Sequence, residues 1–503
     1  MCKRYILVLF LLSACARLIS CTFKNEDEYV AKKYCSSCHL FPEASLLDKA
    51  TWRQHVLPAM GKLMGVRHLG NNIFEEADND YHSKAPLVPE EDWRKIVNYY
   101  LDAAPQVMEL QKTDPVKNFT NRFIVKQAFA AGAPSNTFLK IDSINSLIYA
   151  ANRIDSSIYT LDRGLRLVRK QNVHGVVVDM FFENYLKLKN GNQGVLTKIG
   201  IMDPNDFKTG SAEEFVMDKS GRLARQSKLF DTLTRPVQTI KADLDGDGSE
   251  DYLICGFGNK SGSFYWMKNQ GNGSFEQKIL RNLPGATKAY IADYNKDGLP
   301  DILALFAQAE EGIFLFINKG KGAFETREVL RFPPVYGSSY FELNDIDHDG
   351  DADIIYTCGD NADYSSNVLK NYHGVYIFIN KGDFTFSRKF FYPIHGAYKA
   401  VARDFDKDGD IDVAVISFFP DKKHQPQEAF VYLENTGNFT FTASTIKEYN
   451  AGNWITMDAA DVDKDGDDDI VIGNLYLPYR ASDKEATPAQ KPFCLLLVNQ
   501  TVE

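Results

Sequence analysis

The feature that most restricts the fold is a short acidic pattern that occurs five times. Each copy has Asp or Asn at positions 1 and 3, Asp at positions 5 and 9, and Gly at position 6; the copies begin at residues 243, 293, 345, 404 and 461. They recur about every 55 residues, and a short apolar run follows each. Self-similarity at such a period indicates units that bury their apolar faces only by stacking on neighbours. The sequence therefore predicts a repeat architecture.

A second pattern, Asn-x-Gly-x-x-x-Phe, begins at residues 269, 318, 380 and 435 and is typical of a hairpin turn. Four short strands in a period of about 55 residues are typical of one β-propeller blade. Five blades then begin near residue 235, and residues 124–235 have room for two more. We expect a mainly β fold, with a seven-bladed propeller over residues 120–503. A strand within Arg122–Phe129 is expected to pair with the last blade and so remove the open sheet edges.

Oxygen atoms at positions 1, 3, 5 and 9 with Gly at position 6 allow a loop to curl around a hard cation that takes six to eight oxygen ligands. Calcium is the natural ion, and its expected role is to stabilise a blade turn. An EF-hand would need helices on both sides, whereas apolar strands flank these loops. The first two blades lack the carboxylate spacing, so we expect no calcium in them. The expected calcium ligands are Asp243, Asp245, Asp247, Asp251, Asp293, Asn295, Asp297, Asp301, Asp345, Asp347, Asp349, Asp353, Asp404, Asp406, Asp408, Asp412, Asp461, Asp463, Asp465 and Asp469.

These loops and turns resemble the FG-GAP or VCBS repeats, the calcium-loop propeller blades also found in integrin α-subunits. The likeness covers about residues 240 to 500. It implies a calcium-stabilised propeller, but a fold shared by many proteins does not by itself select a function.

Upstream of the repeats, Cys35-Ser-Ser-Cys38-His39 has the C-x-x-C-H spacing of covalent haem attachment. Two thiols on one helical turn can reach the two vinyl groups of a porphyrin, and the next residue offers an imidazole to the iron. The alternative is a redox-active C-x-x-C pair, which the His after the second Cys and the absence of a preceding strand disfavour. We therefore expect haem c as a covalent cofactor.

The sixth iron ligand is expected from the segment that follows. Residues 51–60 have a helical pattern that ends in Met60, and a Met ligand raises the potential of a haem. The competing ligands are Met64, His55, His68 and His82. Residues 89–101 have an acidic first turn and apolar residues at helical spacing, which predicts a closing helix. Residues 24–110 as a whole resemble a monohaem cytochrome c domain, a small all-α fold.

Residues 1–20 begin with a basic pair and continue as an apolar run, which is the layout of a secretory signal. Cys15 and Cys21 each end a sequence that resembles the bacterial lipobox, so either is a candidate for lipidation, with Cys15 preferred; a plain signal peptide is the alternative. We expect an exported protein, either periplasmic or an outer-membrane lipoprotein of a bacterium. No other run is long enough to span a bilayer, so membrane attachment would be through a lipid anchor only.

The formal net charge of −10 and the lack of any basic cluster exclude a typical nucleic-acid-binding surface. Five positions before each acidic loop stands a polar residue on the strand expected to face the propeller axis. Together with Tyr336 and His395, which are expected at the channel mouth, this column of polar residues could bind an anionic or sugar-like ligand. The alternative is that these side chains only fill the channel and contact water. The candidate ligand residues are Gln238, Lys288, Tyr336, Tyr340, His395, Lys399 and Thr456.

The sequence contains no readable Ser-His-Asp set, nucleotide loop or zinc motif, so the catalytic residues stay unknown. The leading hypothesis is an exported haem protein that transfers electrons to or from a redox partner, with the propeller as a platform or as a dehydrogenase-type module. The alternatives are a polysaccharide-binding or polysaccharide lyase propeller, whose ligand would be a glycan or other small molecule, and a non-enzymatic adhesion or assembly module. The C-x-x-C-H motif favours the first, because the alternatives have no evident need for haem.

Overall fold

The computed structural model describes residues 26–66, 85–111, 116–129, 134–183, 192–364, 367–477 and 491–502. The chain divides into two compact units, a helical unit within Met1–Gln111 and a β unit within Lys112–Glu503. The predicted signal segment with Cys15 and Cys21 lies outside the described residues, as do His68 and His82. No described helix is long and apolar enough to cross a membrane.

The helical unit consists of short helices around an aromatic core. Residues 26–35 are helical, and α2 (Lys49–Thr51), a π-helical turn (Trp52–Val56) and α3 (Leu57–Leu63) form one continuous helical stretch. The predicted closing helix is present as α4 (Glu90–Ala103), which begins after Pro89 with three acidic residues in its first turn. Trp93, Ile96 and Tyr100 form its buried face. The ring of Tyr100 lies 4.2 Å from that of Trp52, which joins α4 to the middle helices.

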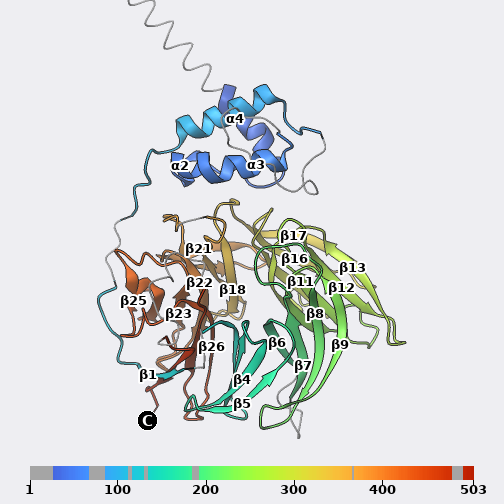
Figure 1. The fold of residues 1–503 in the computed structure, drawn as a ribbon, viewed down its shortest axis with the longest axis vertical. Coiled ribbons are helices and arrows are strands. Elements are labelled where there is room, and N and C mark those ends of the chain that lie inside the picture. The colour runs from blue at the N-terminus through green and yellow to red at the C-terminus, as the bar shows by residue number, and fades with distance from the viewer. Residues whose placement is uncertain are drawn as a thin grey trace, which may run out of the picture. The chain divides into compact units, whose positions relative to one another are not determined.

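The β unit is a seven-bladed propeller, as predicted (Figure 1). It contains seven antiparallel four-stranded sheets whose strands follow one another in the chain, except in the last blade. The first strands contact one another in a closed cycle and therefore surround the central axis. These first strands are β2 (Asn136–Asp142), β6 (Val177–Glu183), β10 (Pro236–Ala242), β14 (Ala286–Ala292), β18 (Ser338–Asn344), β22 (Ala397–Arg403) and β26 (Trp454–Ala460).

The second strands are almost wholly buried, and the outermost strands consist mainly of exposed and half-buried residues. The second strands are β3 (Leu147–Asn152), β7 (Asn192–Lys198), β11 (Asp251–Gly256), β15 (Asp301–Phe306), β19 (Asp353–Cys358), β23 (Asp412–Ser417) and β27 (Asp469–Asn474). The third are β4 (Ser157–Asp162), β8 (Gly210–Met217), β12 (Ser263–Asn269), β16 (Gly312–Asn318), β20 (Gly374–Asn380), β24 (Phe430–Asn435) and β28 (Cys494–Asn499). The outermost are β5 (Leu167–Asn172), β9 (Leu223–Leu233), β13 (Phe275–Arg281), β17 (Phe324–Arg331), β21 (Phe386–Pro393), β25 (Phe441–Ser444) and, for blade 7, β1 (Phe123–Ala128).

The ring closes as the sequence predicts. Strand β1 pairs antiparallel with β28 along its whole length, from Phe123 opposite Asn499 to Ala128 opposite Cys494. The last blade therefore takes its outer strand from the beginning of the propeller segment, and β28 is paired on both sides instead of being left as an edge. Arg122 strengthens this closure because its guanidinium also donates to Thr501 Oγ1, at 3.0 Å.

The apolar core is divided among the blade interfaces. Each pair of neighbouring blades, including the last and the first, encloses its own cluster of buried aliphatic and aromatic side chains. Cys255, Cys358 and Cys494 are members of these clusters, and all three are buried free thiols. The blades thus depend on one another for burial, as expected for stacked repeats.

Candidate functional site

The five acidic loops connect the first and second strands of blades 3 to 7, and all have one backbone conformation. Gly at position 6 has φ between +84° and +105° in every copy, a region that residues with a side chain rarely adopt. Position 4 is also left-handed in every copy, although it is Gly only in the first. The conformation gathers carboxylates of positions 1, 3 and 5 in the loops that begin at Asp404 and Asp461, and of positions 1, 3 and 9 in those that begin at Asp243 and Asp345.

The Asp at position 9 fastens the loop to the rest of its blade. It is the first residue of the second strand, and in each copy one carboxylate oxygen accepts from the backbone N–H of the Asn that ends the third strand, at 2.7–2.9 Å. The other oxygen accepts from the backbone N–H of loop position 2, at 3.0–3.2 Å. The two sequence patterns are therefore two halves of one hydrogen-bonded unit. Burial raises the pKa of Asp353 to about 6 and the pKa values of Asp412 and Asp469 to about 7.

The sequence shows the Asn pattern four times, but the structure contains a fifth copy. Asn499 ends β28, and its backbone and side chain make the same contacts as the other four, with Asp469 and with the carbonyl of Asp468. It lacks the following Gly and Phe, so the pattern could not reveal it. It can be found only by aligning the ends of the third strands.

Four of the loops bring three carboxylates together, with ligand oxygens within 4.8 Å of one another. The exception among the described loops is the one that begins at Asp293, where position 3 is Asn295. Oδ1 of Asp245, Asp404 and Asp463 is buried and has no hydrogen-bond donor among the described groups. An unsatisfied buried carboxylate oxygen is costly, and a bound cation removes that cost. The residues therefore fit a calcium ion.

Two loops differ in having a basic side chain beside them. Lys268 Nζ contacts Asp245 and lies 3.6 Å from Asp247, while Arg122 Nη2 lies 3.3 Å from Asp406. Where blade 3 has Lys268, blades 4 to 7 have Ile317, Ile379, Glu434 and Val498. Repeat spacing gives no sign of either contact.

The first strands carry the polar column, and the structure gives its register a physical basis. Every first strand has a β-bulge near its start, and the column residue follows that bulge. In blades 1 and 2 the equivalent positions, which the sequence analysis did not identify, are Phe138 and Asp179. Each stands four positions before the last residue of its first strand, as the column residues of blades 3 to 7 do.

Charges from several blades meet around the axis. Asp179 of blade 2 interacts electrostatically with Lys140, Lys288 and Lys399 of blades 1, 4 and 6, and burial raises its pKa. Burial lowers the pKa of Lys399 to about 8, against the opposing effect of Asp458.

The lysine ammonium groups around the axis contact aromatic rings and one carboxylate. The ammonium group of Lys399 lies over the ring of Tyr340, 4.7 Å from its centroid, and that of Lys288 lies 5.2 Å from the ring centroid of Tyr290. Lys140 Nζ lies 3.4 Å from Asp458 Oδ1. The carboxylates of Asp179 and Asp458 therefore neutralise the ammonium groups around the axis only in part.

The other predicted ligand residues are engaged within the protein. Gln238 is buried and accepts from the backbone N–H of Ala289 at 2.7 Å, and Thr456 is buried. Tyr336 stacks on Tyr372, with ring centroids 4.4 Å apart. His395 is buried, with Nδ1 2.9 Å from Glu428 Oε2, a contact that raises its pKa against the opposing effect of burial. The structure therefore brings together Lys288, Tyr340 and Lys399 but does not place Tyr336 and His395 with them.

The C-x-x-C-H motif lies at the end of helix 26–35. Cys35 is half-buried, Cys38 is exposed, and neither forms a disulfide. Burial raises the pKa of Cys35 to about 11. Met60 is half-buried on α3.

His39 Nδ1 lies 2.9 Å from the backbone carbonyl oxygen of Leu40. A carbonyl only accepts, so Nδ1 carries the proton and the Nε2 lone pair is available for a metal, as is usual for a ligating His. Two free thiols, an imidazole with a lone pair on Nε2 and a thioether are the donor set of a c-type haem. The residues present therefore fit this group.

Comparison with known proteins supports the repeats. A family model described as an FG-GAP-like repeat matches residues 243–304, 293–356 and 404–472, so the chain contains FG-GAP-like repeats. No curated protein matches the chain.

Among solved structures, the Neurospora crassa Pan2 WD40 domain is similar at a TM-score of 0.45 with 10% identity, over 76% of this chain and 96% of that one. A virginiamycin B lyase from Staphylococcus aureus is similar at a TM-score of 0.45 with 9% identity, over 75% of this chain and 99% of that one.

Proposed function

We propose that this chain, whose FG-GAP-like repeats form a seven-bladed propeller, is an exported electron-transfer protein that carries one covalent haem in its helical unit. The observation that carries the proposal is Cys35-Ser-Ser-Cys38-His39 at the end of a helix, with both thiols free and the imidazole Nε2 available. Haem supplies one-electron transfer when bound, which none of the protein's own side chains supplies. The propeller is the calcium-stabilised platform for a redox partner or substrate.

The chain's own residues would hold and tune the group. Cys35 and Cys38 would anchor it, and Leu40 would keep His39 in the tautomer that binds iron. Met60 would be the second axial ligand and would raise the potential. Leu40, next to His39, is 40% exposed, and Leu63 on α3 is 44% exposed. A bound apolar macrocycle would cover such side chains.

The test is a reduced-minus-oxidised visible spectrum of the full chain, expressed with c-type haem maturation. We expect a covalently held haem in the wild type and none in Cys35→Ser/Cys38→Ser. Met60→Ala should change the spectrum and lower the reduction potential, whereas the control Met64→Ala, one helical turn away, should not. Absence of haem from the wild type would refute the proposal, and an effect of Met64→Ala alone would reassign the ligand.

Export and a lipid anchor at Cys15 or Cys21 are part of the proposal. Mass spectrometry of the mature N-terminus in a bacterial host would identify the modified residue. A mature chain that retains residues 1–20 without modification would contradict this part.

A second candidate function rests on the axial cations. Lys288 and Lys399 belong to different blades and lie over Tyr290 and Tyr340, an arrangement that could bind an acidic oligosaccharide in a polysaccharide-binding or lyase protein. Titration with galacturonate oligosaccharides tests it. Lys288→Ala and Lys399→Ala should each weaken binding, and Lys381→Ala, an exposed residue of blade 5, should not. If neither axial substitution changes any binding or activity profile, this candidate is wrong.

A further inference from the structure

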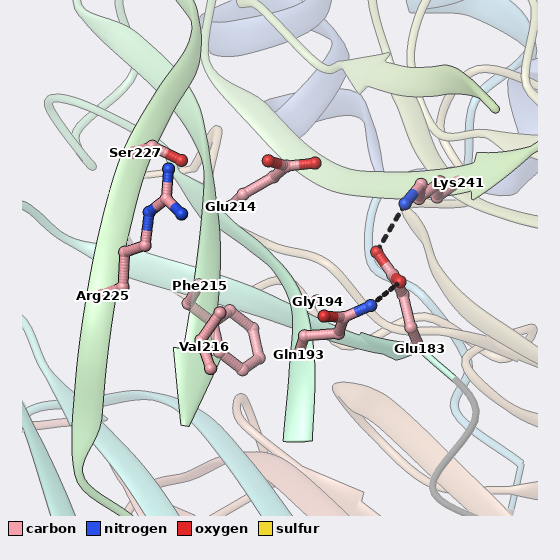
Figure 2. Close-up of a pocket in the computed structure, with 9 residues that line it drawn as sticks. All are labelled: Glu183, Gln193, Gly194, Glu214, Phe215, Val216, Arg225, Ser227 and Lys241. Atoms are coloured by element: carbon pink, nitrogen blue, oxygen red, sulfur yellow. Dashed lines mark hydrogen bonds and ion pairs between the residues drawn. The ribbon is translucent and has the colours of Figure 1, made fainter. Parts of the chain in front are cut away.

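A cavity of about 200 Å³ lies between blades 2 and 3, apart from the acidic loops and from the axial column (Figure 2). Strands β6 to β9 of blade 2 and β10 of blade 3 line it. Its volume is below the roughly 300–1,000 Å³ of sites for drug-sized ligands, so any ligand has to be small. Its lining residues are Glu183, Gln193, Gly194, Glu214, Phe215, Val216, Arg225, Ser227 and Lys241.

The local sequence of blade 2 explains why the cavity forms there. Strand β9 is the longest in the propeller, and its pairing with β8 contains three register shifts, which disturb the outer edge of this blade. Gly194 lines the inner side. A Cβ on Gly194 would lie 1.8 Å from Phe181 O, so only Gly permits the close approach of β6 and β7.

The two sides of the cavity differ in whether their polar groups have partners within the protein. Lys241 Nζ lies 2.7 Å from Glu183 Oε1, and Gln193 donates to Glu183 Oε2 at 2.7 Å, so this side is internally satisfied. On the other side, Arg225 is exposed and Ser227 is half-buried, and neither the guanidinium nor the hydroxyl has a hydrogen-bond or ion-pair partner among the described residues. Figure 2 shows both at the β9 side of the cavity.

Glu214 lies between the two sides, with its carboxylate facing the cavity (Figure 2). One of its oxygens accepts from Tyr252 Oη at 2.6 Å, and no ion pair joins it to Arg225 in the described structure. Two carboxylates and two basic groups make the lining neutral overall, with an unpaired cation and a partly satisfied anion held apart. Val216 lies on the same face of β8 as Glu214 and adds an apolar surface that is 43% exposed, whereas the ring of Phe215 is buried in the cluster between blades 1 and 2.

We propose that this cavity binds a free α-amino acid with an apolar side chain. The ligand carboxylate would accept from Arg225 and Ser227, its ammonium group would donate to Glu214, and its side chain would contact Val216. A guanidinium that has no protein partner is suited to bidentate binding of a carboxylate. The net neutrality of the lining favours a zwitterion over a ligand with a single charge.

Isothermal titration calorimetry of the full chain with L-leucine tests the proposal. We expect saturable binding, and a Kd raised about tenfold or more by Arg225→Gln and by Glu214→Gln, since each removes a charge-assisted hydrogen bond. The matched control is Lys228→Gln, which removes an exposed charge from the same strand and should leave the Kd unchanged. Circular dichroism of each variant would show that the fold is retained.

Two analogues separate the charges. L-Leucinamide lacks the carboxylate and N-acetyl-L-leucine lacks the ammonium group, so both should bind at least about tenfold more weakly than L-leucine. Equal binding of either analogue would show a site for one charge only and would overturn the proposal. Failure of the wild type to bind L-leucine at about 10 mM, or equal binding by the Arg225 variant, would also overturn it. The haem spectrum is independent of these outcomes.

Discussion

Asn318 offers a direct test of whether the turn Asn residues join neighbouring blades. It is fully buried, and its Nδ2 donates to Leu244 O of blade 3 at 2.7 Å and to Pro300 O of its own blade at 3.1 Å. Its Oδ1 accepts from the N–H of Gly320 at 2.9 Å. Asn269, the equivalent residue of blade 3, is half-buried and makes the bonds within its blade but no bond to the described residues of blade 2.

The expected magnitudes follow from these contacts. Neutral hydrogen bonds contribute about 0.5–1.5 kcal/mol each, so Asn318→Ala should lower the free energy of unfolding by about 2–4 kcal/mol. Asn269→Ala removes fewer bonds at a more exposed site and should cost about 1–2 kcal/mol. Asn318→Asp keeps an acceptor for Gly320 but sets a carboxylate against two carbonyl oxygens, so it should be at least as destabilising as Ala.

The assay is urea unfolding in saturating calcium, followed by tryptophan fluorescence. Trp266 is fully buried in the cluster between blades 3 and 4, so its emission reports on the interface that Asn318 crosses. The reasoning is refuted if Asn318→Ala is no more destabilising than Asn269→Ala, or if Asn318→Asp is neutral.

Three further predictions concern metal, protons and thiols. Chelation by EDTA should lower the melting temperature, since each loop filled at a calcium concentration a hundredfold above its Kd contributes about 3 kcal/mol; an unchanged melting temperature would contradict occupied loops. The pKa of Lys399 is about 8 in the folded protein against 10.5 ordinarily, so the unfolded chain binds more protons between these pH values. Wild-type stability should therefore rise from pH 8 to 10.5 by about 1–3 kcal/mol relative to Lys399→Met, and parallel pH profiles would contradict this. In protein made without haem, Ellman's reagent should react fast with Cys38 and slowly with Cys35, because Cys35 is half-buried with a pKa of about 11. Haem attachment should abolish both reactions. Cys38→Ser should remove the fast phase.

Much of the fold could be predicted because its determinants are local and repeated. The acidic loops, the Asn turns and their common period predict the blade, and counting periods predicts seven. Closure by β1 also follows, since an unassigned strand before blade 1 and a missing strand in blade 7 satisfy each other.

The sites were less predictable because they depend on contacts between distant segments. Lys268 and Arg122 reach acidic loops through strand ends that no spacing reveals, and Asn499 acts as a fifth turn Asn without its pattern. His395 is polar in sequence, yet Glu428, 33 positions later, holds it in a buried pair. The cavity beside Arg225 depends on irregular pairing of β8 with β9.

The sequence by itself determined the repeat, the blade count, the carboxylate spacing of the loops and the C-x-x-C-H motif, because each depends on residues a few positions apart. Only the tertiary structure decided which charges meet. Ring closure brings Lys140, Asp179, Lys288 and Lys399 from four blades to one axis, where burial shifts the pKa values of Asp179 and Lys399. Electrostatic interactions depend on distance in space and on exclusion of water, and neither is set by position along the chain.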